Sequence, residues 1–162
     1  MVAGGKEYEV DCIIFSTGFE VGTSYVRRSG YDVTGLDGLN LSDKWAEGMR
    51  TLHGVMTSGF PNLFIISNSQ AGFTTNFPHA MDETSQHIGY ILNECRKDNL
   101  ASIDVEKEAE DKWVEEIIGV SRFASDFQES CTPGYYNNEG KPNPKSVQNG
   151  PYGKGSRPYF RI

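Results

Sequence analysis

A thin core is the strongest constraint that this 162-residue sequence places on its fold. Only residues 7–15 and 63–66 have the apolar character of buried strands, and the continuous apolar run 12–15 is typical of a strand covered on both faces. Apolar residues at helical spacing predict two helices, over residues 78–96 and 106–127. Roughly 60 further residues are loop, which is too much for a self-contained compact domain. We therefore expect a loop-rich α/β fold that is a piece of something larger.

The composition limits the possible partners and location. Lys plus Arg number 15 and Asp plus Glu number 22, so the net charge is −7, whereas nucleic-acid binding needs a clustered excess of basic residues. No apolar run approaches the ~18 residues of a membrane span, and residues 1–10 are too polar for a signal peptide. Cys12, Cys95 and Cys131 are odd in number and far apart, which favours a reducing compartment. We expect no nucleic-acid or membrane partner and a cytoplasmic location.

One group of side chains has a spacing that suggests a metal. His79, Glu83 and His87 stand at i, i+4 and i+8 of the predicted helix. Successive members nevertheless drift by ~40° around the helix, and no fourth ligand is evident. We interpret these residues as a solvated or interface face and predict no metal site. The acidic run 106–116 is likewise interpreted as a solvated helix face.

The carboxy-terminal region changes to loop chemistry. Pro, Gly and Asn recur after residue 129 and exclude a helix or a central strand there, while Tyr135 and Tyr136 lie inside this tail. We expect the tail to be an ordered lid or a segment that needs a partner surface. The predicted parts are a strand and loop part over 1–77, a helical part over 78–128 and a loop or lid over 129–162.

Several segments, in order, resemble NADPH-dependent flavin monooxygenases. Residues 11–19, Asp-Cys-Ile-Ile-Phe-Ser-Thr-Gly-Phe, resemble the segment Asp-x-Ile-Ile-x-Ala-Thr-Gly-Phe of that family, with Ser16 where Ala is usual. Residues 131–142 resemble a carboxy-terminal loop of one Baeyer–Villiger monooxygenase subgroup, whose members act on cyclic, steroid-like or aryl ketones. The other similar segments are residues 35–39, 44–45, 51–54, 59–64 and 72–79.

The motifs that are absent indicate which part of such an enzyme this is. The family carries two Gly-x-Gly-x-x-Gly turns, one for each dinucleotide. Here the only Gly-x-Gly is Gly153-Lys154-Gly155, with Pro158 in place of the third glycine and no buried strand before it. The family fingerprint Phe-x-Gly-x-x-x-His-x-x-x-Trp is also missing. The resemblance thus implies a carboxy-terminal fragment, with FAD- and NAD(P)-binding, Rossmann-like sheet pieces, whose partner is the missing amino-terminal part.

The resemblance also implies two contacts with FAD. A glycine at a strand end lets a dinucleotide approach the main chain, and a helix N-terminus stabilises negative charge on a flavin. Without the family, these segments would be an ordinary turn and a capped helix start with Phe77 in a staple-like contact. The implied cofactor-binding residues are Thr17, Gly18 and Phe19 at the strand end and Thr75, Asn76 and Phe77 at the helix start.

A substrate and nicotinamide pocket is implied beside them. Closure of a lid keeps water from a reactive intermediate, and the tail tyrosines would supply it, although a tail that merely carries two aromatics is an equal alternative. The implied pocket residues are Phe73, Phe77, Tyr135 and Tyr136.

The activity implied for the parent enzyme is oxygen insertion into ketones. NADPH would reduce FAD, dioxygen would give a flavin peroxide, and its attack on the ketone would give an ester or lactone, with the hard chemistry supplied by the flavin. We expect no catalytic residue in this chain, and we expect the isolated chain to be inactive and not to hold FAD tightly. The alternative is a non-catalytic binding or oligomerisation module, which could self-associate through an open sheet edge.

Overall fold

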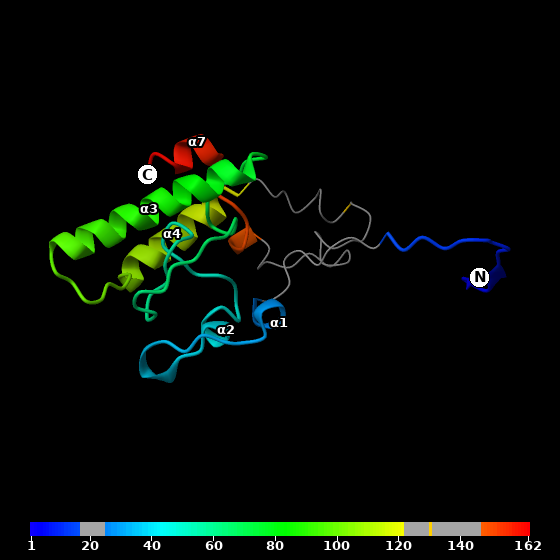
Figure 1. Ribbon diagram of the computed structural model, residues 1–162, viewed down its shortest axis with the longest axis horizontal. Helices are drawn as coiled ribbons and strands as arrows, with labels where there is room; N and C mark the ends of the chain where they lie inside the picture. The colour runs from blue at the N-terminus through cyan, green and yellow to red at the C-terminus, as the bar shows by residue number, and fades with distance from the viewer. Residues whose placement is uncertain (17–24, 122–129, 131–146) are drawn as a thin grey trace.

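The computed structural model describes residues 1–16, 25–121, 130 and 147–162 (Figure 1). The amino-terminal residues form a small antiparallel hairpin in which Val2 is opposite Glu7, and Gly4 and Gly5 make its turn with positive φ angles of 58° and 78°. This hairpin is exposed and lies apart from the helices in Figure 1. The elements are β1 (Val2–Ala3), β2 (Lys6–Glu7), α1 (Tyr25–Ser29), η1 (Leu36–Gly38), α2 (Leu41–Lys44), α3 (Phe77–Lys97), α4 (Lys107–Gly119) and α7 (Ser156–Tyr159).

The two predicted strands are wrong as elements of this chain. Of the predicted range 7–15 only Glu7 lies in a strand, β2, and Ile14 and Phe15 are 85% and 84% exposed. Residues 63–66 are not a strand either, although the backbone N–H of Ile65 donates to the carbonyl of Val55 at 2.7 Å. A strand is stable only when neighbouring strands satisfy its backbone groups. Such neighbouring strands are absent from the described residues. The two apolar runs therefore exist in the sequence, but the sheet that would cover them is not formed by these residues.

Helix α3 begins and ends where the sequence predicts, within one residue. The side chain of Asn76 caps it by accepting from the backbone N–H of His79 at 3.3 Å, and Pro78 occupies the first turn, where a missing N–H is harmless. Arg96 and Lys97 lie in the last turn, where positive charge complements the helix dipole. Local signals therefore set both ends of this helix.

Helix α4 is shorter than predicted and is more deeply buried. It ends at Gly119, a residue that weakens a helix by about 1 kcal/mol relative to Ala, and residues 122–127 of the prediction lie outside the described residues. Trp113 and Ile117 of the predicted apolar stripe are buried. The interpretation of the acidic run as solvated is wrong at Glu110, which is only 1% exposed.

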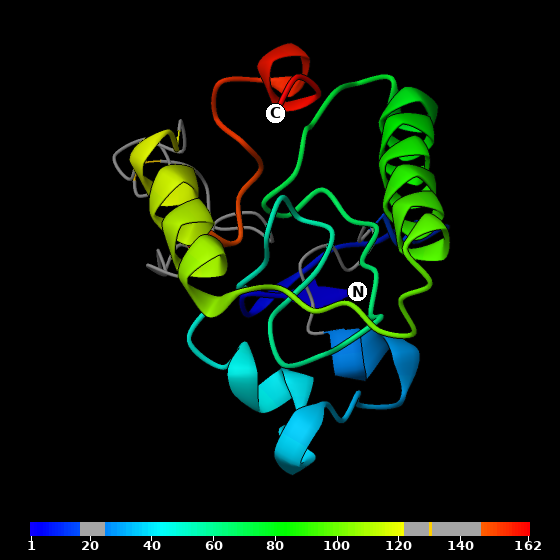
Figure 2. The same ribbon diagram turned by 90° about the vertical axis from the view of Figure 1, so that its left-hand side faces the viewer.

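The core lies between the two long helices. Figure 2 shows α3 and α4 on either side of the loops, with α7 above them. The rings of Trp113 and Tyr152 stack at 5.4 Å, and the indole N–H of Trp113 donates to the carbonyl of Gln70 at 3.1 Å. Burying side chains of this size contributes about 1.5–3 kcal/mol each. The cluster consists of Ala71, Trp113, Ile117, Tyr152 and Tyr159.

The end of the predicted tail belongs to this core. Residues 147–162, the end of the predicted loop or lid, supply two of its buried aromatics, Tyr152 and Tyr159. The backbone N–H of Gln70 donates to the carbonyl of Gly150 at 2.8 Å, and that of Tyr152 donates to the carbonyl of Ala71 at 2.9 Å. Within the described ranges, no helix is both long and apolar enough to cross a membrane.

Candidate cofactor-facing site

The loop over residues 72–79 brings four predicted site residues together at the start of α3. Phe73, Thr75, Asn76 and Phe77 are all exposed, the two phenylalanine side chains by about half. Backbone and side chain within the loop satisfy one another, because the N–H of Asn76 donates to the hydroxyl of Thr74 at 3.2 Å. The loop therefore presents two large apolar side chains and polar groups to its surroundings.

The electrostatics of this helix start favour a negatively charged neighbour. Helix α3 has 21 residues and no acidic residue in its first turn. The positive end of its dipole and its free backbone N–H groups stabilise a nearby anion by about 0.3–1 kcal/mol at an exposed site. These features suit an anionic group placed beyond the start of the helix.

The remaining predicted site residues belong to two other segments of the chain. Thr17, Gly18 and Phe19, predicted for the FAD contact, lie outside the described residues, as do Tyr135 and Tyr136, predicted for the substrate pocket.

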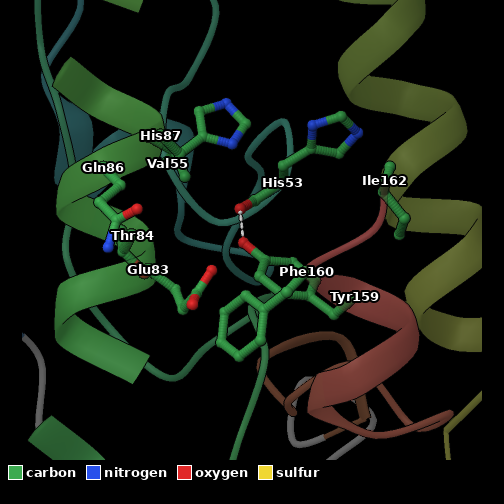
Figure 3. A pocket seen from close by; sticks show the side chains of 9 residues that line it. All are labelled: His53, Val55, Glu83, Thr84, Gln86, His87, Tyr159, Phe160 and Ile162. Carbon is green, nitrogen blue, oxygen red and sulfur yellow. Dashed lines mark hydrogen bonds between the residues drawn. The ribbon is translucent and has the colours of Figure 1, made fainter. Parts of the chain in front are cut away.

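A cavity of about 210 Å³ lies beside α3 (Figure 3). The ring centroids of His53 and His87 are 6.4 Å apart across it, and His53 also meets Trp113 edge-on at 4.7 Å. Burial, with a smaller effect of His87, lowers the pKa of His53 below its usual value of 6.5. The lining residues are His53, Val55, Glu83, Thr84, Gln86, His87, Tyr159, Phe160 and Ile162.

The three residues with metal-like spacing do not converge on one point. His79 pairs with Glu83 at 3.7 Å, while His87 faces His53 across the cavity (Figure 3). Among the residues that the structure describes, no group of three or more His, Cys, Asp or Glu side chains could hold a metal ion.

A buried charge network holds α4 against the loops that lead to this site. The carboxylate of Glu110 accepts from the Lys44 ammonium at 3.0 Å, from the Thr57 hydroxyl at 2.8 Å and from the Ser58 N–H at 2.9 Å. The sequence contains a signal for this burial. Glu110 precedes Trp113, Val114 and Ile117 by three, four and seven residues, a spacing that places it on the buried face.

Comparison with known proteins places the chain among flavin monooxygenases. It is 44% identical, over its whole length, to neopentalenolactone D synthase of Streptomyces avermitilis, and 38% identical, over 94% of its length, to a Baeyer–Villiger monooxygenase of Streptomyces coelicolor. The chain spans 28% and 25% of these relatives, respectively. No family model matches the chain.

Solved structures give the same result. The polycyclic ketone monooxygenase of Thermothelomyces thermophila matches 99% of this chain with a TM-score of 0.82 and 34% identity, and the chain covers 27% of it. The enzyme OTEMO in complex with FAD and NADP matches 72% of the chain with a TM-score of 0.63 and 28% identity, and the chain covers 21% of it. These likenesses agree with the predicted α/β class. The chain belongs to the Baeyer–Villiger type of flavin-containing monooxygenase, of which it represents a carboxy-terminal segment.

Proposed function

We propose that this chain forms one wall of the FAD and NADPH site in a monooxygenase that inserts oxygen into a ketone. In the overall reaction one oxygen atom of O₂ enters the ketone to give an ester or lactone, the other leaves as water, and NADPH supplies two electrons. The observation that carries the proposal is the match of 99% of the chain to a polycyclic ketone monooxygenase, together with a match to an enzyme whose structure holds FAD and NADP.

The 72–79 loop fits the flavin side of this site. In the proposed arrangement Thr75, Asn76 and Phe77 contact FAD, and the start of α3 stabilises negative charge on it. Phe73 and Phe77 face the substrate and nicotinamide, where their exposed rings exclude water. FAD supplies the redox and oxygen chemistry when it is bound.

Residues beyond the described ranges complete the proposal. Thr17, Gly18 and Phe19 lie against FAD, and Tyr135 and Tyr136 cover the substrate pocket. Each of the three parts then has its own role. Residues 1–77 contact FAD, residues 78–128 form the helices that support the site, and residues 129–162 include the segment that covers the substrate pocket.

The isolated chain is expected to be inactive. Its sequence has neither of the two glycine-rich turns that hold the phosphates of the dinucleotides. The amino-terminal part of the enzyme must supply those turns.

A chimera tests the proposal. This chain would replace the matched region of the S. avermitilis synthase, and NADPH oxidation would be followed with and without a polycyclic ketone. We expect ketone-dependent oxidation and a product that has gained one oxygen atom. The change Asn76→Ala should weaken FAD binding because it removes the cap of α3, whereas Asn93→Ala, on an exposed turn of the same helix, should not. A folded chimera that binds no FAD would contradict the proposal.

A second candidate function is self-association without catalysis. The exposed apolar side chains of Ile14 and Phe15 favour it. Gel filtration of the isolated chain gives its oligomeric state, and the FAD content of the chimera then separates the two functions. A defined oligomer of the isolated chain, together with a folded chimera that binds no FAD, would support the second candidate.

A further inference from the structure

The 72–79 loop is contacted at its start and at its end by aromatic residues from the carboxy-terminal region. We propose that Tyr159 and Phe160 are positioning residues that fix this loop relative to the core. Only one consequence of this inference, that the positioned loop faces FAD, rests on the proposed function. The contacts themselves involve residues of this chain alone.

Close packing against Gly72 is the first contact. An ideal Cβ on Gly72 would lie 2.6 Å from Cδ1 of Tyr159 and 3.2 Å from Cζ of Phe160. A distance below 3.0 Å is essentially never seen for a real Cβ, so any side chain at this position would displace the rings or the loop. Only glycine allows the two aromatic rings to lie directly on the backbone where the loop begins.

The far end of the loop is contacted by Phe160 alone, and Tyr159 ties the pair to the core. The ring of Phe160 meets the ring of His79 edge-on at 5.6 Å, in the first turn of α3. The Tyr159 hydroxyl donates to the backbone carbonyl of His53, which Figure 3 shows as a dashed line beneath the two histidine rings. Burial raises the pKa of Tyr159 to about 12, so the hydroxyl keeps its proton. The pair is thus itself anchored to the core.

Among the described residues, the loop between these anchors makes no hydrogen bond to a distant part of the chain. The hydrogen bonds described for residues 73–79 are local, such as that from His79 N–H to the Asn76 side chain. Local bonds shape a loop without setting its position on the protein. The contacts at Gly72 and His79 therefore decide where Phe73 and Phe77 point. This arrangement gives Tyr159 and Phe160 a role in placing the side chains that the loop presents.

Hydrogen–deuterium exchange on the full 162-residue chain tests the positioning. In Phe160→Ala we expect exchange at the hydrogen-bonded amides of Asn76 and His79 to accelerate about tenfold or more, with exchange in α4 unchanged, because local opening is separate from global unfolding. Tyr159→Phe keeps the ring over Gly72 and removes only the hydroxyl. It should accelerate exchange around His53 and leave the two loop amides near their original rate. Tyr90→Ala, an exposed aromatic on α3, is the control.

The outcomes separate this inference from the proposed function. Unchanged exchange at the two loop amides in Phe160→Ala would overturn the inference, and so would acceleration that extends equally into α4. Faster local exchange in the chain, with weaker FAD binding by the Phe160→Ala chimera, would support both proposals. Faster local exchange with unchanged FAD binding would support the positioning role and contradict the contact between this loop and FAD.

Discussion

Helices α3 and α4 have the same kind of amphipathic sequence but differ in how they are covered. Four of the 13 residues of α4 are buried, and they centre on Trp113. Of the 21 residues of α3 only Ala80 and Thr84 are buried, both near its start, and Leu92 farther along is 51% exposed. The partners of α4 lie within this chain, whereas the described residues do not cover the later turns of α3. An apolar stripe tells which face of a helix requires cover, but not which segment supplies it.

The largest expected effect is at the centre of α4. Trp113→Ala should lower the free energy of unfolding by about 3–5 kcal/mol, because it removes the stacked ring from the core. Urea denaturation of the full chain measures this change. Leu92→Ala on α3 is the matched comparison and should cost less than about 1 kcal/mol. Equal losses at the two sites would remove the distinction between the helices.

The buried carboxylate of α4 comes next. Glu110→Gln should cost about 3 kcal/mol, because the Lys44 ammonium, itself only 10% exposed, loses its charged partner. The neighbouring Glu115 is exposed, so Glu115→Gln should change stability by no more than about 0.5 kcal/mol. The difference between the urea midpoints of the Glu110→Gln and Glu115→Gln variants measures this difference in stability. A Glu110 variant as stable as the control would show that the network does not hold α4.

The helices could be predicted better than the strands because their signals are local. Asn76 and Pro78 mark the start of α3 in the sequence itself, and the spacing of Trp113 and Ile117 marks the buried face of α4. A strand requires hydrogen bonds to residues distant in sequence. The apolar run 12–15 could therefore be found, but its partners could not be deduced from it.

The core aromatics of the carboxy-terminal region are a further long-range effect. Tyr152 and Tyr159 lie in Gly- and Pro-containing sequence that predicts a loop, and they pack against Trp113, roughly 40 residues earlier. At the candidate site, the grouping of Thr75, Asn76 and Phe77 followed from their adjacency. The bracketing of that loop by Phe160 had no local signal.

A smaller, pH-dependent effect is expected at His53, where the core meets α3. Because its pKa is lowered in the folded chain, the unfolded chain binds more protons at mildly acidic pH. This contribution to stability is therefore complete above pH 6.5 and declines as the pH falls through the folded-state pKa. Urea midpoints between about pH 7.5 and about pH 5.5 should decline less in His53→Gln than in the original chain. An identical decline would assign the pH dependence to other groups.

The smallest effect on stability is expected in the exposed apolar run. Phe15→Ser should change the free energy of unfolding of the isolated chain by less than about 0.5 kcal/mol, because the ring is already in water. The same change should weaken assembly of the chimera, where the run would be covered. Parallel measurements of urea midpoint and chimera yield check both statements. A large loss of stability in the isolated chain would place the partner of this run within the chain itself.

The central claim is that this chain contacts a flavin whose phosphates are held by another part of the enzyme. The most direct test is the FAD content of two purified samples, the isolated chain and the chimera, after gel filtration in excess FAD. We predict a colourless isolated chain and a chimera that retains the flavin. Stoichiometric FAD on the isolated chain would contradict the claim.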